Sequence, residues 1–343
     1  FKKEVVRMDP AKVDEVFSQV VFSGDDFKAT FDKQSGLLTS YIYKKQEYIH
    51  NGQGPQPFFW RAPTDNDYGA KLPTRLKAWR EASYQTPKAE SFNVSKDGDK
   101  SIVKVTYRFP QVDAQWEITY KVFANGIIKV DNRFVAEGTE TPMIPRVGLR
   151  MQLSEILNDL TYYGRGPEEN YIDRNHGTLV GVYKTTADQM YFNYVRPQEN
   201  GHHTDTRWIA LSPNTGNGLV LVADSLIGFN ALRNSIEDFD SEEALPHPYQ
   251  WNNFSPEEVA NHDENAARNV LRRMHHVNDI TPRDFVEVCV DMKQQGVGGY
   301  DSWGARPEPF HQIPANRDYQ WGFTLVPVRS ANQANEAAKY DYR

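Results

Sequence analysis

The chain has 343 residues, of which 39% are hydrophobic and 13% aromatic, so it can bury a substantial core and is not a disordered segment. Its 39 basic and 46 acidic residues give a net charge of −7 without long charged runs, which argues against a nucleic-acid partner. The single cysteine, Cys289, excludes an internal disulfide and a cysteine-based zinc site, and no apolar stretch approaches the roughly 18–20 residues that cross a bilayer.

The first elements along the chain are a linker and a hairpin. Residues 1–22 are weakly patterned, and we interpret them as a linker from a preceding domain. The start at Phe1 rather than at methionine indicates a fragment or a processed piece, so the sequence predicts no cellular location, and a cytoplasmic and a periplasmic home both fit. Residues 27–31 and 37–43 flank a turn and predict two paired strands.

Alternation of apolar and polar residues then dominates the chain. Residues 103–109 and 116–122 both alternate at period two, which is typical of half-buried strands. Asn125-Gly126 follows, the dipeptide that best supports a type I′ hairpin turn, and residues 128–130 resume the pattern. Further strands are expected at residues 147–153, 218–223, 286–292 and 321–326.

Helices are expected to be few and short. The best candidates are residues 185–190 and 256–267, and the polar, alanine-rich residues 329–343 are expected to form a terminal tail. Cys289 lies at an apolar position of a strand-like run, which predicts a core residue rather than a nucleophile. Short strands that recur with turns between them predict an all-β fold, a large antiparallel β-sandwich over residues 23–328.

The first dense polar motif runs from Arg61 to Gly69 and places two carboxylates around an amide, as Asp65-Asn66-Asp67. Such a loop is suited to bind sugar hydroxyls or to hold a cation through oxygen ligands. The alternative is a network of Asx turns in which these side chains satisfy their own backbone. The further ligands and the distal glutamate of an EF-hand are missing from the motif.

The second motif, residues 163–174, combines glycines and a proline with arginine and acidic residues. This composition predicts a loop held by salt bridges rather than a site, because buried charges need partners. Glu168 and Glu169 are adjacent, so a strand would send them to opposite faces. That geometry does not suit a glycosidase, whose two carboxylates face each other at roughly 5–10 Å.

The third motif, residues 196–203, contains a glutamate and two histidines. Glu199 with His202 or His203 would supply a base and an acid if both faced a cleft, and it is the one pairing that we consider for independent catalysis. Two adjacent histidines without an HExxH-like spacing do not predict a zinc site. The pair His275-His276 has fewer polar neighbours and is expected on the surface.

The fourth motif is the glycine-rich run Gly296-Val297-Gly298-Gly299, which leads into Asp301-Ser302-Trp303-Gly304. Glycines let a backbone turn tightly and approach another group closely. A tryptophan displayed there offers a flat apolar face and one N–H donor, which suits the apolar face of a sugar ring; the alternative is an ordinary core tryptophan. The run does not open a helix, so it does not predict a dinucleotide site.

These four motifs, in this order, resemble the C-terminal domain of the large bacterial β-galactosidases of glycoside hydrolase family 2. The matching residues are Arg61-Ala62-Pro63, Asp65-Asn66-Asp67, Gly166-Pro167, Glu169-Asn170-Tyr171, Asp173-Arg174, Pro197, Glu199-Asn200-Gly201, Gly296, Gly298-Gly299 and Asp301-Ser302-Trp303. The resemblance covers about residues 22–328. It implies a large antiparallel supersandwich of the galactose mutarotase-like type, in a domain that some members encode as a separate small subunit.

In this family the two catalytic glutamates and the metal ligands belong to a preceding barrel domain, so the resemblance implies no catalytic residue, metal ligand or cofactor in this chain. It implies that Trp303 packs against the sugar in a β-galactosidase that hydrolyses terminal β-D-galactosides such as lactose. Asp301 and Ser302 are expected to shape the loop of Trp303, and Gly69 to act as a hinge. The residues expected at or near the sugar pocket are Trp303, Asp301, Ser302, Arg61, Asp65, Asn66, Asp67 and Gly69.

The resemblance also implies partners. They are the remaining domains or the large subunit of the enzyme, a galactoside substrate and further copies of the parent in a homo-oligomer, with Mg²⁺ and Na⁺ bound through other domains. The isolated chain is expected to be inactive. Two alternatives stay open: a carbohydrate-binding or assembly module without a role in the pocket, and a mutarotase-like epimerase that uses Glu199 with His202 or His203.

Overall fold

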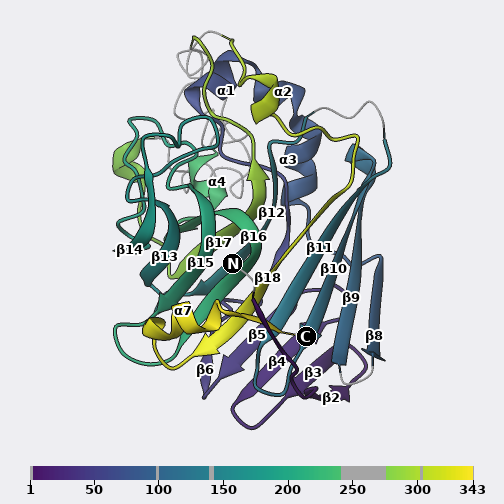
Figure 1. Cartoon of the computed structure of the whole chain (residues 1–343). Helices are drawn as coiled ribbons and strands as arrows, with labels where there is room; N and C mark the ends of the chain where they lie inside the picture. Colours follow the sequence, from purple (N-terminus) through teal and green to yellow (C-terminus); the bar gives the residue numbers. More distant parts are fainter. Residues whose placement is uncertain (1–2, 98–99, 139–142, 241–275, 302–303, 343) are drawn as a thin grey trace, which may run out of the picture.

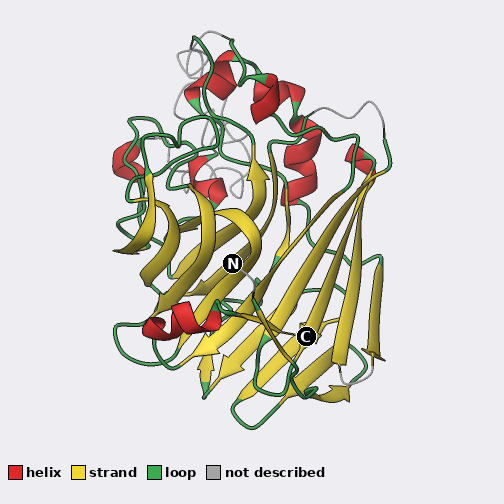
Figure 2. Cartoon of the chain, viewed as in Figure 1, coloured by secondary structure: helices red, strands yellow, loops and turns green. Residues whose placement is uncertain are grey.

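The computed structural model describes residues 3–97, 100–138, 143–240, 276–301 and 304–342 (Figure 1). The helix candidate at residues 256–267, together with His275, Ser302 and Trp303, lies outside the described residues. Antiparallel strands dominate the described part of the chain, so the predicted all-β fold is confirmed (Figure 2).

In the described part of the chain, the larger of the two main sheets has twelve strands and branches at one of them. Its main path runs in space through β14 (Leu179–Thr186), β13 (Asp159–Gly166), β15 (His203–Ser212), β16 (Gly218–Leu232), β18 (Tyr319–Val328), β11 (Ile128–Ala136), β10 (Ala114–Val122), β9 (Lys100–Phe109) and β8 (Ser91–Asp97). The first part of β16 pairs with β18, whereas its last part pairs with β17 (Phe285–Gln294). From there the sheet continues to β12 (Arg146–Ser154) and β7 (Gln56–Phe58).

The smaller sheet packs against the larger one. Its five strands are β2 (Lys12–Glu15), β3 (Gln19–Ser23), β4 (Phe27–Asp32), β5 (Leu38–Tyr43) and β6 (Gln46–Glu47). Phe31 of β4 meets Tyr120 of β10 with ring centroids 4.9 Å apart, and the Tyr48 hydroxyl donates to the Gly218 carbonyl at 2.9 Å. A continuous apolar core therefore joins both sheets, as the predicted sandwich requires.

The predicted hairpins are present, with one difference in turn chemistry. β4 pairs with β5, and β9, β10 and β11 pair as consecutive antiparallel strands. A type I′ turn needs positive φ at both central residues, but the backbone at Asn125-Gly126 reaches positive φ at Gly126, with 87°, and not at Asn125. The Gly126 N–H donates to the Phe123 carbonyl, so the glycine closes the turn instead of standing at its centre. The type I′ prediction is therefore wrong.

The later predicted strands all fall within observed ones. Residues 147–153 lie in β12, residues 218–223 in β16, residues 286–292 in β17 and residues 321–326 in β18. Each of these strands is buried over most of its length, which explains why runs of apolar residues marked them in the sequence. Cys289 is buried within β17, as its apolar surroundings predicted.

The helices are short, and three consecutive ones lie at one end of the molecule, beyond the strand ends (Figure 2). The helical segments are α1 (Asp65–Gly69), α2 (Leu72–Arg75), α3 (Lys77–Tyr84), α4 (Ile236–Phe239) and α7 (Ala334–Ala337), with 3-10 turns at Pro110–Val112, Val277–Asp279, Pro309–His311 and Ala331–Gln333. The predicted helix at residues 185–190 is wrong. β14 continues through Thr185, which pairs with Leu160 of β13, because its β-branched residues suit a strand, and a turn follows Thr186.

Both ends of the chain carry more structure than expected. The boundary at residue 23 falls inside β3, where Val20 and Phe22 are buried; two apolar residues at period two were too short a run to reveal that strand. β1 (Glu4–Val6) pairs in parallel with β19 (Tyr340–Tyr342), so the segments expected to be a linker and a tail form a two-stranded sheet.

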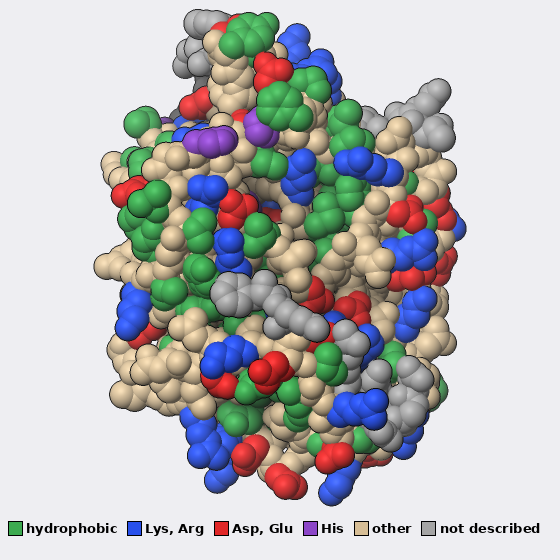
Figure 3. Space-filling view, in the orientation of Figure 1, with side chains coloured by type: hydrophobic (Ala, Val, Ile, Leu, Met, Phe, Trp, Pro, Cys, Tyr) green, Lys and Arg blue, Asp and Glu red, His purple; other side chains and the backbone are tan. Residues whose placement is uncertain are grey.

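The surface mixes charged and apolar side chains. Basic and acidic side chains are interspersed on the face shown in Figure 3, in line with the even spread of charge along the sequence. The edge strand β14 leaves Leu179 and Val182 exposed. Among the described residues, no helix is long and apolar enough to cross a bilayer.

Candidate functional site

The four polar motifs, which are far apart in the sequence, meet near α1 at the end of the molecule that carries the three consecutive helices (Figure 1). They line a pocket with a volume of about 290 Å³. The lining residues are Thr64, Asp65, Asn66, Tyr171, Arg174, Tyr194, Gln198, Glu199 and Val297. Because every motif contributes to this lining, segments that are far apart in the sequence form one hollow. We call it the four-motif pocket.

α1 begins inside the first motif and is stabilised at its N-terminus by a reciprocal cap. The Thr64 hydroxyl accepts a hydrogen bond from the Asp67 N–H at 3.2 Å, and the Asp67 carboxylate accepts one from the Thr64 N–H at 3.0 Å. This arrangement satisfies two of the backbone donors that the start of a helix leaves open. Asp67 therefore hydrogen-bonds to the backbone of its own motif, as the Asx-turn alternative expected.

Arg61 connects the first motif to the fourth. It forms a bidentate ion pair with Asp67, and its guanidinium also donates to the carbonyls of Gln295 at 2.7 Å and Gly296 at 3.0 Å. Burial alone would lower the pKa of Arg61, but the adjacent Asp67 carboxylate raises it overall, so the guanidinium stays charged. Arg61 and Asp67 are both buried and hold the glycine-rich run in place from behind the surface.

Asp65 is exposed and Asn66 half-buried, so both side chains of this motif reach the surface. The Asn66 amide donates to the Val297 carbonyl at 3.1 Å, and the Asp65 N–H donates to the Gln198 side chain at 3.2 Å. The Asp65 carboxylate lies 3.8 Å from Arg196, a distance typical of a loose surface pair. These two side chains therefore keep oxygen atoms for a ligand, unlike Asp67, whose two carboxylate oxygens are both occupied.

The first motif also touches the segment that carries the predicted tryptophan. A Cβ atom placed on Gly304 would stand 3.4 Å from the Gly69 carbonyl oxygen, so the two glycines lie against each other. Asp301 accepts a hydrogen bond from the Ala305 N–H at 3.1 Å. Gly304, the first described residue after 302–303, therefore lies beside the end of α1.

The second motif is bonded to the same glycine-rich run. The Asp173 carboxylate accepts from the Gly298 N–H at 2.8 Å, and a Cβ atom on Gly296 would stand only 2.4 Å from the same carboxylate. Gly296 is therefore required because a side chain there would displace Asp173. Glu169 accepts from the Gly201 N–H at 2.7 Å and pairs with Arg174, so this motif is the salt-bridged loop that its composition predicted.

Behind the pocket lies a buried polar network that the sequence analysis did not find. Arg146 is completely buried and pairs with Glu199 at 3.1 Å and with Asp291 at 3.3 Å. The same Glu199 oxygen accepts from Asn230 at 2.9 Å and from Gln294 at 3.2 Å. Burial raises the pKa of Asp291 to about 7, against the opposing attraction of Arg146. A signal of this network was present in the sequence, since Arg146 begins a mostly apolar strand and burying a charge there is costly unless it is paired.

The pairing of Glu199 with His202 or His203 is not assembled for catalysis. Glu199 lines the four-motif pocket, whereas His202 lines a different one, and Asn230 bonds to both from between them. Both ring nitrogens of His203 lie 3.1 Å from backbone carbonyls, at Gly201 and Pro167. Burial, followed by repulsion from Arg146, lowers the pKa of His202 to about 3, so this imidazole is a weak base near neutral pH.

The comparison with known families agrees with the resemblance drawn from the four motifs. The family model described as the β-galactosidase small chain matches residues 23–325, and the chain belongs to this family. It is 33% identical over 316 residues to a β-galactosidase of Priestia megaterium and 29% identical over 323 residues to one of Streptococcus thermophilus. These alignments cover 92% and 93% of this chain, but the chain spans only 27% and 28% of the length of those two relatives.

Solved structures with a similar course of the chain include two from Lactobacillus acidophilus. A galactose mutarotase related enzyme gives a TM-score of 0.47 at 8% identity, over 91% of this chain and 98% of that one. A galactose 1-epimerase gives a TM-score of 0.48 at 8% identity, over 93% of this chain and 99% of that one.

Within the described residues, no three His, Cys, Asp or Glu side chains lie close enough together to hold a metal ion.

Proposed function

We propose that this chain is the non-catalytic C-terminal domain of a β-galactosidase that hydrolyses terminal β-D-galactosides such as lactose, and that it completes the sugar pocket with Trp303. Its membership of the β-galactosidase small-chain family supports the proposed activity of the parent enzyme. The chain spans about a quarter of the length of its relatives, so the remaining length can hold other domains. Those domains or a large subunit are its partners, in a homo-oligomer of the parent. They carry the catalytic glutamates and bind Mg²⁺ and Na⁺.

The observation that carries the proposal is the contact between Gly69 and Gly304. It sets the end of α1 beside Gly304, while Arg61 holds the carbonyls of Gln295 and Gly296 at the start of the glycine-rich run. Two loops joined in this way form one surface, on which Asp65 and Asn66 supply polar oxygens. A tryptophan in this surface would supply the flat apolar face that packs against a sugar ring.

An inactive isolated chain is part of the proposal. The acid and base of glycoside hydrolysis must flank the scissile bond and exchange protons with it. Glu199, the best acidic candidate in the four-motif pocket, is bound through one oxygen by Arg146, Asn230 and Gln294. A carboxylate held in this way serves to fix the strands around it, so the chemistry has to come from elsewhere in the parent.

Hydrolysis of a chromogenic β-galactoside tests the proposal. The chain is assayed alone, and then mixed with the N-terminal portion of a related β-galactosidase that lacks this domain. We expect no hydrolysis by the chain alone and activity on mixing, because each part supplies what the other lacks. Hydrolysis by the chain alone, abolished in Glu199→Gln, would contradict the proposal. Activity on mixing that is insensitive to Trp303→Ala would instead favour an assembly module without a role in the pocket.

A further inference from the structure

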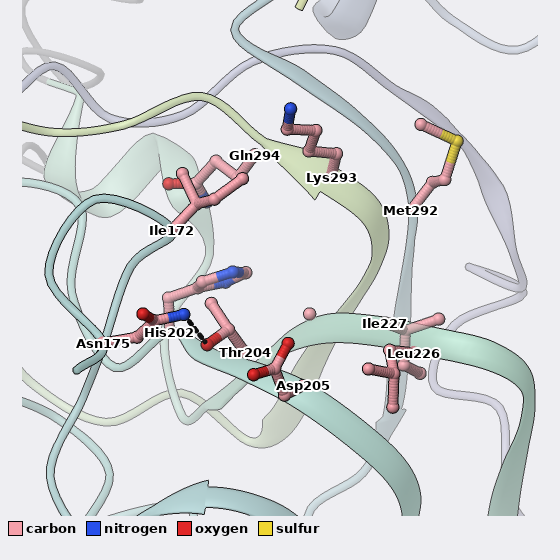
Figure 4. A pocket seen from close by; sticks show the side chains of 11 residues that line it. Ile172, Asn175, His202, Thr204, Asp205, Leu226, Ile227, Met292, Lys293 and Gln294 are labelled. Atoms are coloured by element: carbon pink, nitrogen blue, oxygen red, sulfur yellow. Dashed lines mark hydrogen bonds between the residues drawn. The ribbon is translucent and has the colours of Figure 1, made fainter. Parts of the chain in front are cut away.

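A second pocket lies where β15 and β16 leave their regular pairing (Figure 4). Thr206 pairs with Ile227 and Trp208 with Val222, so two residue steps on β15 oppose five on β16. Such bulges redirect side chains and often border functional sites. The hollow that results has a volume of about 100 Å³, and we call it the β15–β16 pocket. It is lined by Ile172, Asn175, His202, Thr204, Asp205, Leu226, Ile227, Gly228, Met292, Lys293 and Gln294.

The surrounding network determines which nitrogen of His202 carries the proton. The Asn230 amide donates both of its hydrogens, to Glu199 and to the Asn200 carbonyl, so its oxygen is an acceptor. That oxygen lies 2.9 Å from Nδ1 of His202 and also accepts from Arg146. Nδ1 therefore carries the proton, and Nε2 of the neutral ring has a free lone pair.

Nε2 belongs to the pocket rather than to the network. Figure 4 shows the His202 ring pointing into the hollow between Ile172 and Thr204. Among the described residues, no group forms a hydrogen bond with Nε2, although the side chain is only 2% exposed. A Cβ atom on Gly228 would stand 2.5 Å from Nε2, so the glycine keeps this nitrogen uncovered. The pocket thus presents an unpaired acceptor to a ligand that can donate a hydrogen bond.

The other lining groups restrict the chemistry of that ligand. The two charged lining groups are already engaged, because the Asp205 carboxylate pairs with Arg165 at 2.5 Å and the Lys293 ammonium lies 3.5 Å from the Phe310 carbonyl. Neither is therefore free to balance the charge of an ionic ligand. Leu226 and Met292 provide apolar surface beside these polar groups. A ligand that is neutral, donates hydrogen bonds and carries an apolar face fits all of these conditions.

We propose that the β15–β16 pocket binds a neutral sugar ring, with one hydroxyl donating to Nε2 of His202. This site is separate from the four-motif pocket, because the stacked rings of Tyr171 and His202, with centroids 5.3 Å apart, stand between the two hollows. It is a binding site and not a second active site, since the acidic and basic side chains that line it in the described part of the chain, Asp205 and Lys293, are engaged by Arg165 and by the Phe310 carbonyl.

Nuclear magnetic resonance of the full chain with ¹⁵N-labelled histidine tests the proposal. Galactose and glucose serve as neutral probes, and inorganic phosphate as the charged one. We expect at least one of the sugars to shift the Nε2 resonance of His202 saturably, and phosphate to leave it unchanged. No saturable shift with either sugar, or a shift with phosphate, would overturn the proposal.

Variants separate this pocket from other sites. Leu226→Ala, at a half-exposed position, should weaken sugar binding by roughly fourfold for each methylene that the sugar covers, and Leu179→Ala on β14 is the matched control. His202→Asn keeps the donor toward Asn230 and removes Nε2; in saturation-transfer measurements it should weaken binding by roughly three- to tenfold. Equal effects of the two leucine variants would overturn the proposal. So would a loss of binding in Trp303→Ala, which would place the sugar at the proposed galactoside pocket instead.

Discussion

Arg61 and Asp67 form a bidentate ion pair inside the protein, with Nε 2.9 Å from Oδ2 and Nη2 2.8 Å from Oδ1. The same guanidinium holds the carbonyls of Gln295 and Gly296, so a single side chain joins α1 to the glycine-rich run. Removing one partner of a buried pair leaves the other charge without compensation. This pair therefore controls both the stability of this end of the molecule and the course of the loop that leads to Trp303.

Replacing Arg61 with methionine should lower the free energy of unfolding by about 3–5 kcal/mol, because Asp67 would be left buried without its partner. Chemical denaturation of the chain measures this loss. The matched control is Arg108→Met, since Arg108 also pairs with two carboxylates but on the surface, where such pairs contribute about 1 kcal/mol or less. Equal losses in the two variants would contradict the role given to Arg61.

Gly296→Ala should disturb the same loop by overpacking. The new Cβ would stand 2.4 Å from the Asp173 carboxylate, which must then release the Gly298 N–H. We expect a loss of stability of about 1–3 kcal/mol and a higher KM in the complemented enzyme. Gly177→Ala is the control, because a Cβ there meets nothing within 4 Å. If Gly296→Ala behaves like Gly177→Ala in both assays, the link between the second and fourth motifs has no functional weight.

The buried neutral state of His202 predicts that acid destabilises the chain. The folded pKa is about 3 and the ordinary value 6.5, so between these values the unfolded chain takes up a proton that the folded chain refuses. This group alone should reduce the free energy of unfolding by up to about 1.4 kcal/mol for each pH unit of acidification in that window. Burial also lowers the pKa of His203, which adds to the same trend.

Asp291 has the opposite effect on the pH dependence of stability, so the contribution of His202 has to be isolated with a variant. Its folded pKa of about 7 lies above the ordinary 3.8, so its protonation favours the folded state as the pH falls between those values. The difference in unfolding free energy between the wild type and His202→Asn removes this shared contribution. We expect the difference to shrink as the pH falls below 6.5. A difference that is independent of pH would show that His202 takes up its proton equally well in both states.

Cys289 should be unreactive in the native chain. It is buried in β17, and burial raises the pKa of its thiol well above the usual value despite the nearby Arg146, so little thiolate forms. Alkylation followed by mass spectrometry should find no modification without denaturant and complete modification in unfolding conditions. Rapid native alkylation would show that β17 opens readily, and would weaken the assignment of Arg146 and Asp291 to a closed network.

The strands were predictable from the sequence because they depend on a local pattern. Alternation fixes which face of a strand is buried, and the predicted runs in β9, β10 and β12 follow it. The start of α1 was readable as well, since Thr64 and Asp67 have the spacing of a capping box. The motif was interpreted as a loop because its polar residues outweighed that signal.

The inner network was not predictable, because its members come from separate strands. Arg146, Asn230 and Asp291 lie on β12, β16 and β17, and only the pairing of those strands brings them together. The burial of Arg61 was hidden for the same reason, since its carbonyl partners lie more than two hundred residues away. Period-two patterns say which face a residue takes but not which distant polar group it will meet.

The measurement that tests the central claim most directly is the steady-state kinetics of Trp303→Ala in the complete β-galactosidase. Loss of a ring that packs against the sugar should cost about 1–3 kcal/mol of binding free energy, which raises KM roughly five- to 150-fold. Tyr300→Ala is the control, because this neighbouring aromatic residue is 90% exposed and has no assigned role in the pocket. We predict a raised KM in the first variant alone. An unchanged KM and kcat in Trp303→Ala would contradict the claim that this domain completes the sugar pocket.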